Sequence, residues 1–307
     1  MKGIATAALL ALIAGCASSP EADPRYRPAE NVLEIVAVLR RHIADDTYRF
    51  APARDFTGRN VYRATLLRLE NLEAAHGDAL QAGHFADVIA FSKARALERL
   101  RAFDLAAEQY RLAARYEGPL QQEARRNAAL CDAFAEAATL EPGSGEVDGG
   151  DAPLEAFADR RALLEVLSDD VSGSHYETIL REELEYADMA RARYLLDTRR
   201  LVPDGDVRAL SAHQHLVMEH RGSKNRNRHM LSLADFYADL AEEYIAKHPP
   251  ESLRFDPPAF EELVSSAARL YESVANQDGA IERLEAAQRL EGFLAFTLRV
   301  DRDRFSR

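Results

Sequence analysis

The stretch ARALERLRAFDLAAEQYRLAARYEG, residues 94–118, repeats its apolar side chains every three to four positions. That spacing places them on one face of an α-helix. Small and aromatic residues stand where two packed helices would touch, namely Ala94, Phe103, Ala106, Tyr110 and Ala113. Gly118 and Pro119 then end one helix and open the next, because glycine suits a helix C-terminus and proline a first turn. The stretch therefore predicts a pair of packed helices.

A second stretch, residues 264–292, repeats much of this pattern. Its matching positions are Val264, Ala268, Tyr271, Ala280, Leu284, Ala287 and Gly292. The interval from Ala280 to Gly292 equals the interval from Ala106 to Gly118. Both stretches resemble tetratricopeptide repeats, which have a period of roughly 34 residues. The resemblance implies helical hairpins that stack into an α-solenoid with a concave binding surface.

Parts of the chain depart from the tetratricopeptide pattern. Lys93 stands where the family prefers leucine, and Gln277 replaces the aromatic residue at the second turn. Residues 174–247, between the two stretches, also fit the pattern poorly. A generic bundle of α-helices therefore remains an alternative to repeat stacking.

The helical period continues through the rest of the chain from about residue 30. The first apolar stripe consists of Val32, Ile35, Val36, Leu39 and Ile43. Further helices are predicted at about 58–76, 84–101, 104–117, 119–140, 153–168, 174–199, 206–220, 225–247, 258–276 and 279–303. With no Trp, 15 Gly and 12 Pro in 307 residues, the composition excludes an all-β or collagen-like fold. We predict an all-α fold, a helical hairpin array resembling a tetratricopeptide solenoid, with two helical layers as one allowed arrangement.

An apolar-poor segment, residues 141–153, divides the predicted helices into two groups. It reads EPGSGEVDGGDAP and predicts a flexible acidic linker. This boundary predicts an N-terminal helical repeat region over residues 31–140 and a C-terminal helical repeat region over residues 154–307. A continuous solenoid with an inserted loop is an equally allowed arrangement.

The first sixteen residues have the features of a secretory signal. Lys2 supplies a positive charge, residues 4–13 are almost wholly apolar or small, and Ile13-Ala14-Gly15-Cys16 follows directly. This segment resembles a bacterial lipoprotein signal with its lipobox. The resemblance implies removal of residues 1–15 and acylation of Cys16, for example with palmitate. Such a lipoprotein carries a diacylglyceryl group on the cysteine sulfur and a third acyl chain on its amino group, and three acyl chains suffice for stable membrane anchoring. An ordinary signal peptide with a chance cysteine is the alternative.

The residues after Cys16 indicate where such a lipoprotein would reside. Ala17 and Ser18 stand where an aspartate typically retains such proteins in the inner membrane of enteric bacteria. Outer-membrane anchoring, with the body on the periplasmic face, is therefore expected. Three prolines within residues 16–30 predict an extended tether between the lipid and the helical body.

Charge and cysteine content limit the partners. The formal charge of -12 argues against nonspecific electrostatic binding of nucleic acid or anionic lipid, because both are also negatively charged. If Cys16 is lipidated, Cys131 has no partner in the chain, so no internal disulfide is expected. Cys131 lies in a helical pattern, where a buried thiol is the simplest interpretation.

One basic tract stands out in this acidic chain. Its charged residues are Arg221, Lys224, Arg226, Arg228 and His229. Together with backbone amides at a helix start near Asn225, they are candidates for binding an anion or an acidic partner segment. A surface loop neutralised by acidic neighbours such as Glu182 and Glu185 is the alternative.

Histidines invite a metal hypothesis, which the spacing does not favour. The four are His213, His215, His220 and His229. Because residues two apart on a helix point to different faces, His213 and His215 cannot readily share an ion. We therefore predict no metal site and no cofactor, and expect these histidines to face solvent.

The one catalytic candidate is a glutamate near the second repeat-like stretch. Glu272-Ser273, with Gly279-Ala280 later, resembles two elements of helical lytic transglycosylases, which would use such a glutamate as general acid. The gap between the elements is short for that family, and the expected aromatic and glutamine positions are unfilled. Glu272 is therefore expected on the exposed side of its helix, and a peptidoglycan-acting enzyme is the alternative function.

The sequence favours a non-catalytic adaptor. An outer-membrane lipoprotein facing the periplasm would use stacked helices as a scaffold for protein-protein interaction with another envelope protein. A third hypothesis, an envelope ligand carrier, requires a deep apolar cavity between helices.

Overall fold

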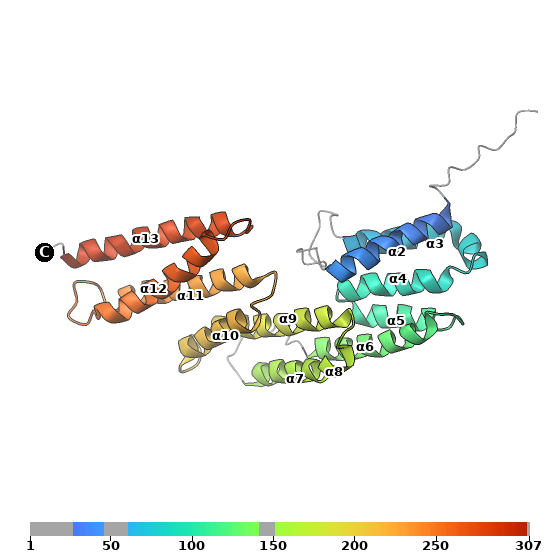
Figure 1. Cartoon of the computed structure of the whole chain (residues 1–307). Coiled ribbons are helices and arrows are strands. Elements are labelled where there is room, and N and C mark those ends of the chain that lie inside the picture. The colour runs from blue at the N-terminus through green and yellow to red at the C-terminus, as the bar shows by residue number, and fades with distance from the viewer. Residues whose placement is uncertain (1–26, 46–60, 141–150, 306–307) are drawn as a thin grey trace, which may run out of the picture. The chain divides into compact units, whose positions relative to one another are not determined.

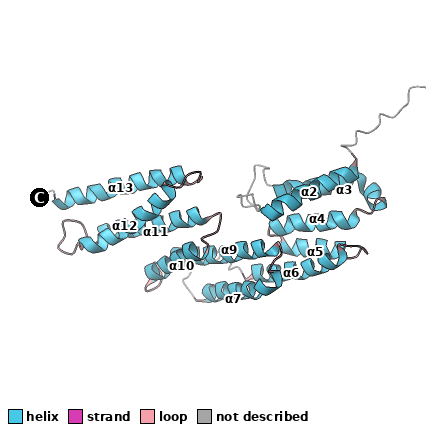
Figure 2. Cartoon of the chain, in the orientation of Figure 1, coloured by secondary structure: helices cyan, strands magenta, loops and turns pink. Residues whose placement is uncertain are grey.

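The computed structural model describes residues 27–45, 61–140 and 151–305. Within these ranges the chain forms twelve helices and no strand (Figures 1 and 2). The helices are α2 Pro28–Asp45, α3 Val61–Ala82, α4 Ala86–Arg99, α5 Phe103–Ala113, α6 Gln121–Thr139, α7 Ala152–Val166, α8 Ser168–Val171, α9 Tyr176–Asp197, α10 Gly205–Glu219, α11 Arg226–Lys247, α12 Pro257–Ala275 and α13 Arg283–Phe305. The predicted all-α helical array is confirmed. Among the helices so described, none is long and apolar enough to cross a bilayer.

The chain divides into two compact units, Met1–Glu136 and Ala137–Arg307. The division falls inside α6, shortly before the predicted linker at 141–153. Residues 141–150 of that linker lie outside the described residues, as do the predicted signal at 1–15, Cys16 and the tether as far as residue 26. The two units are therefore treated separately below.

The first unit is built on helices that contact their neighbours in sequence. α2 packs on α3 and α4, and α4 pairs with α5. The core between α2, α3 and α4 contains Ile35, Leu39, Tyr62, Leu69 and Ala96. Between α4 and α5, the repeat-like positions Ala94, Ala106, Tyr110 and Ala113 are all buried. Small side chains let these two helices pack against each other, as residues 94–118 predict.

Tyr110 shows how that helix pair accommodates a polar group. Its hydroxyl oxygen donates a hydrogen bond to Oε2 of the buried Glu98 at 2.8 Å. Its ring lies edge-on to that of Phe91, with 5.1 Å between the ring centroids. Burial, and then the neighbouring Glu98 charge, raise the pKa of Tyr110 well above its ordinary value. The phenol therefore stays protonated and serves as a hydrogen-bond donor inside the core. Cys131 of α6 is also buried, as the sequence predicts.

The second unit has two apolar clusters that share one helix. One cluster joins α9, α10 and α11 through Leu195, Ala212 and Phe236. The other joins α11, α12 and α13 through Met230, Tyr271 and Phe293. Because α11 contributes buried residues to both clusters, it holds α9 and α10 to the α12–α13 hairpin.

Packing in the α12–α13 hairpin differs from the repeat-like prediction. Tyr271 is buried as expected, but Ala267 and Ala286 occupy the close-contact positions predicted for Ala268 and Ala287. Leu284 is 70% exposed, and Ala287 is exposed as well, so their prediction as packing residues is wrong. Ala280 and Ala268 are only half-buried. Because α13 packs against α12 through Ala286, Leu284 and Ala287 lie outside that contact.

Several helix ends differ from the sequence prediction. α3 runs past the predicted end at 76 to Ala82, across a non-helical residue at His76. It continues because Leu80 packs in a cluster with Val32 and Ile89. α13 begins at Arg283 rather than at 279, after a turn in which Gly279 adopts a φ of 76°, a conformation that favours glycine.

Candidate functional site

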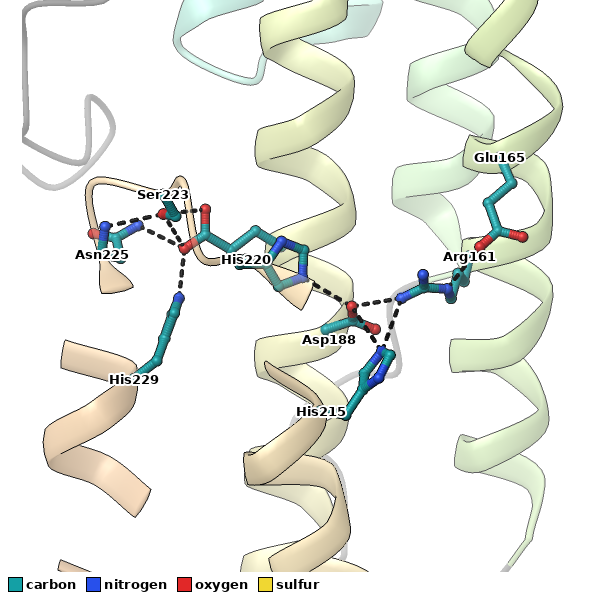
Figure 3. Close-up of polar contacts among 9 residues, drawn as sticks. Arg161, Glu165, Asp188, His215, His220, Ser223, Asn225 and His229 are labelled. Carbon is teal, nitrogen blue, oxygen red and sulfur yellow. Dashed lines mark hydrogen bonds and ion pairs between the residues drawn. The ribbon is translucent and has the colours of Figure 1, made fainter. Parts of the chain in front are cut away.

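One face of α9 carries carboxylates at Glu182, Glu185 and Asp188. Because residues three apart on a helix lie on the same face, these side chains project together. α9 packs against α7 and α10, and the chain returns to it at the turn before α11. The helices of the second unit therefore bring basic and polar side chains from three other segments to these carboxylates (Figure 3).

Glu185 is the centre of the first group of contacts. Its carboxylate accepts hydrogen bonds from His229 Nε2 at 2.5 Å, from Ser223 Oγ at 2.6 Å and from Asn225 Nδ2 at 3.2 Å. Burial alone would raise the pKa of Glu185, but these hydrogen bonds outweigh it and hold the pKa below its ordinary value. The buried Glu185 therefore stays ionised and fixes the turn that leads into α11.

Asp188 is the centre of the second group. Its Oδ2 accepts hydrogen bonds from Arg161 Nη1 of α7 at 2.5 Å and from His220 Nε2 at 2.9 Å, and His215 Nε2 lies 3.6 Å away. Arg161 also donates from Nε to Glu165 at 2.8 Å. Burial would raise the pKa of Asp188, but the bonds from His220 and Arg161 lower it below its ordinary value. Figure 3 shows Asp188 between His220 and Arg161, with His215 below it and close to both Asp188 and Arg161.

A cavity of about 670 Å³ opens beside Asp188, and we call it the α7–α9–α10 pocket. Its apolar lining consists of Leu154, Phe157, Ala158, Ala187, Leu195, Val207 and Ala212. Its polar lining consists of Arg161, Asp188, Arg191, Arg208, Ser211 and His215. Ligand pockets are commonly of this size, with mostly apolar walls and a few polar groups. This pocket is the best candidate for a functional site in the second unit.

The charged lining of the α7–α9–α10 pocket is mainly cationic. Asp188 is its one carboxylate, and it pairs with Arg161. Arg191 of α9 and Arg208 of α10 make no side-chain hydrogen bond or ion pair to any residue within the described ranges. Two guanidinium groups are therefore available to bind an anionic group of a ligand.

Two residues of the predicted basic tract, Lys224 and His229, are bound to carboxylates within the second unit. Lys224 donates to Glu182 at 2.9 Å, which is the neutralisation that the alternative interpretation describes. His229 is only 3% exposed and bonded to Glu185, so it is not available to a partner. Arg221 and Arg226 are exposed, and Arg228 is largely exposed while lying 3.3 Å from Glu282. Three of the five predicted contact residues thus remain accessible.

The expectation of solvent-facing histidines is wrong for most of the group. His213 is 4% exposed and its Nδ1 lies 2.9 Å from the Ala209 carbonyl oxygen, while His220 and His229 bind the α9 carboxylates. Only His215 keeps a large part of its side chain in solvent. Burial lowers the pKa of His213 below its ordinary value, although the bond to Ala209 partly opposes this shift. Throughout the described ranges, no group of three or more His, Cys, Asp or Glu side chains is arranged to hold a metal ion.

Glu272 lies exposed on α12. It does not line the α7–α9–α10 pocket, whose residues come from α7, α9 and α10. No feature of its surroundings favours the lytic-transglycosylase-like alternative over the adaptor hypothesis.

Sequence reasoning missed the residues that build the pocket. Arg161, Asp188, Arg191 and Arg208 belong to no motif, and they come from three separate helices, α7, α9 and α10. One local signal was available, since carboxylates at positions 182, 185 and 188 share a helix face that also carries buried residues. A charged stripe on a packed face indicates that neighbouring helices supply its partners.

Comparison with known proteins adds no relative from which a role could be transferred. No protein-family model matches the chain, and a search of curated proteins finds no match to it.

Proposed function

We propose that this chain is a lipid-anchored helical scaffold of the bacterial cell envelope that binds a partner protein without catalysing a reaction. Acylated Cys16 would hold it in the outer membrane on the periplasmic side, as the lipobox-like sequence implies. The α7–α9–α10 pocket would receive a segment of the partner. The observation that carries this proposal is the pocket itself, where two arginines that pair with no residue of the described ranges lie beside an apolar lining.

The frame of the pocket supports a binding role because it is held by buried polar contacts. Arg161 joins α7 to Asp188 of α9, and the preceding residue, Arg160, joins the same two helices through Glu183 at 3.1 Å. His220 ties the C-terminal end of α10 to Asp188. A pocket whose walls are fixed before binding loses less conformational entropy when a ligand enters.

The electrostatics of Asp188 also favour binding over chemistry. A general base works best when its pKa lies near the working pH. The pKa of Asp188 is held below its ordinary value, so this carboxylate is a weak base at neutral pH. Its charge instead keeps Arg161 in place on the pocket wall.

Site-specific photocrosslinking in native envelopes tests this proposal. A photoreactive amino acid would replace Val207, which lines the pocket and is 67% exposed. Val166 of α7 is the matched control, because it is a valine of the same unit, 75% exposed and outside the pocket lining. We expect position 207 to capture one envelope protein in good yield and position 166 not to capture it.

Equal capture from both positions, or no adduct from position 207, would contradict the proposal. Charge reversal at Arg226 and Arg228 in the same strain tests the second predicted contact region. If the basic tract takes part, the adduct at position 207 should weaken. An unchanged adduct would remove the tract from the interface and leave the pocket.

A further inference from the structure

Two of the three arginines that line the α7–α9–α10 pocket, Arg191 and Arg208, come from two helices that pack together. Arg191 belongs to α9 and Arg208 to α10, and α9 packs against α10. Both line the same cavity, and neither has an acidic partner among the residues that the structure describes. Guanidinium groups present a fork of N–H donors that matches a carboxylate. The pocket is thus suited to carboxylate groups approaching from solvent.

The same pocket offers apolar surface beside these charges. Phe157 and Leu154 of α7 line it, and so does Val207, whose side chain is mostly exposed. The pocket therefore presents apolar side chains to solvent next to its arginines. A ligand that fills this pocket therefore needs both acidic groups and an apolar group.

We infer that the α7–α9–α10 pocket binds an acidic peptide segment, whose carboxylates pair with Arg191 and Arg208 while a neighbouring apolar side chain covers Leu154 and Val207. This inference rests on the proposed function, because it names the chemistry of the segment that the partner inserts. Ser211, which also lines the pocket, offers a hydroxyl for a hydrogen bond to the peptide backbone.

A peptide fits these features better than a fatty acid or a free phosphate. An acyl chain gains most when apolar walls enclose it, whereas Val207 lies at an open part of the lining. Free phosphate would use the arginines and leave the apolar lining uncovered. A peptide can use both and keep its remaining backbone in water.

Selection from a displayed library of random twelve-residue peptides tests the inference on the full-length mature protein. We expect enriched sequences that combine Asp or Glu with Leu, Ile or Phe. The most enriched peptide, labelled with fluorescein, should bind more weakly as salt concentration rises. A version with every Asp and Glu replaced by Asn or Gln should bind at least about tenfold more weakly.

Matched variants localise the binding. The double variant Arg191→Gln and Arg208→Gln should lose about tenfold in affinity for each arginine, because each removes a charge-assisted contact. Arg193→Gln is the control, since Arg193 belongs to α9, is exposed and does not line the pocket. Its affinity should match that of the unmodified protein.

Three results would overturn the inference. The first is that the selection enriches no sequence or enriches basic sequences. The second is that the double variant binds the peptide with unchanged affinity. The third is that decanoate or inorganic phosphate displaces the labelled peptide at lower concentrations than the same peptide without the label. The crosslinking experiment separates this inference from the proposed function. An adduct at position 207 without acidic-peptide binding would overturn the inference alone, while peptide binding without an adduct would support it and overturn the proposed function.

Discussion

Glu185 remains charged inside the fold because three side chains donate hydrogen bonds to it. Ser223, Asn225 and His229 lie around the start of α11, so a single carboxylate on α9 organises the approach to that helix. A buried charge without such partners would be strongly destabilising. At the scale of single residues, this cluster is where the second unit is most sensitive to substitution.

We expect Glu185→Gln to lower the free energy of unfolding by about 1–3 kcal/mol, because buried donors lose their charged acceptor. Urea denaturation followed by circular dichroism measures the change. Glu182→Gln is the control, since its partner Lys224 and Glu182 itself are both partly solvated and an ion pair of that kind contributes about 0–1 kcal/mol. Equal losses in the two variants would contradict the role given to Glu185.

His213 makes stability depend on pH. Burial lowers its pKa in the folded state below the ordinary value of 6.5. As pH falls through that value, the unfolded chain takes up a proton before the folded chain does, so stability is complete above this range and is lost below it. His213→Asn keeps a hydrogen-bond donor and should flatten the decline in thermal midpoint between about pH 6.5 and 5.

Glu185 and Asp188 act in the same direction at lower pH. Their pKa values lie below the ordinary values of 4.5 and 3.8, so their stabilisation is lost only as pH falls below that range. The His213 contribution can therefore be separated by comparing the variant with the unmodified protein above pH 5. An unchanged slope there would show that His213 is not the group responsible.

At the scale of helices, the last hairpin shows how neighbours decide which face is buried. Ala286 faces the core of α12 and α13, and Ala287 faces outward. In the α4–α5 pair, by contrast, the predicted positions Ala106 and Ala113 are the buried ones. The two hairpins share a sequence pattern, but their helices do not bury equivalent positions.

Adjacent alanines in α13 provide a direct test of this register. Ala286→Leu should lower the free energy of unfolding by about 1–3 kcal/mol, because three added carbons overpack a filled contact. Ala287→Leu should change it by no more than about 0.5 kcal/mol, as expected for a surface position. Chemical denaturation of both variants measures the difference. A larger loss for Ala287→Leu than for Ala286→Leu would contradict the observed packing and support the repeat pattern, which predicts Ala287 as the buried residue.

At the scale of the whole molecule, the proposed function depends on the anchor at residue 16. The chain has two cysteines, Cys16 and the buried Cys131. Cys16→Ser should release the protein from the membrane fraction, because each buried methylene of an acyl chain contributes about 0.8 kcal/mol to anchoring. Cys131→Ser should remain in the membrane fraction. Intact mass should show acyl chains on the second variant and none on the first.

A protein that stays membrane-bound after Cys16→Ser, or a native mass without acyl chains, would remove the anchor from the proposal. The helical body would then still present the α7–α9–α10 pocket. Its partner would be sought outside the envelope.

The all-α class, the approximate helix positions and the small residues of the α4–α5 pair can be predicted from the sequence alone. These follow from a period of 3.6 residues and from side-chain size, which act between near neighbours in the chain. The packing of the helices, in contrast, determines that His213 and His229 are buried, that His220 bonds to Asp188, that Leu284 is exposed, and that Arg161 lies close to Asp188 and His215. Arg161 and His215 are 54 residues apart, and no local pattern records that contact. Which charges become paired, and which remain open to a ligand, depends on how α7, α9 and α10 pack.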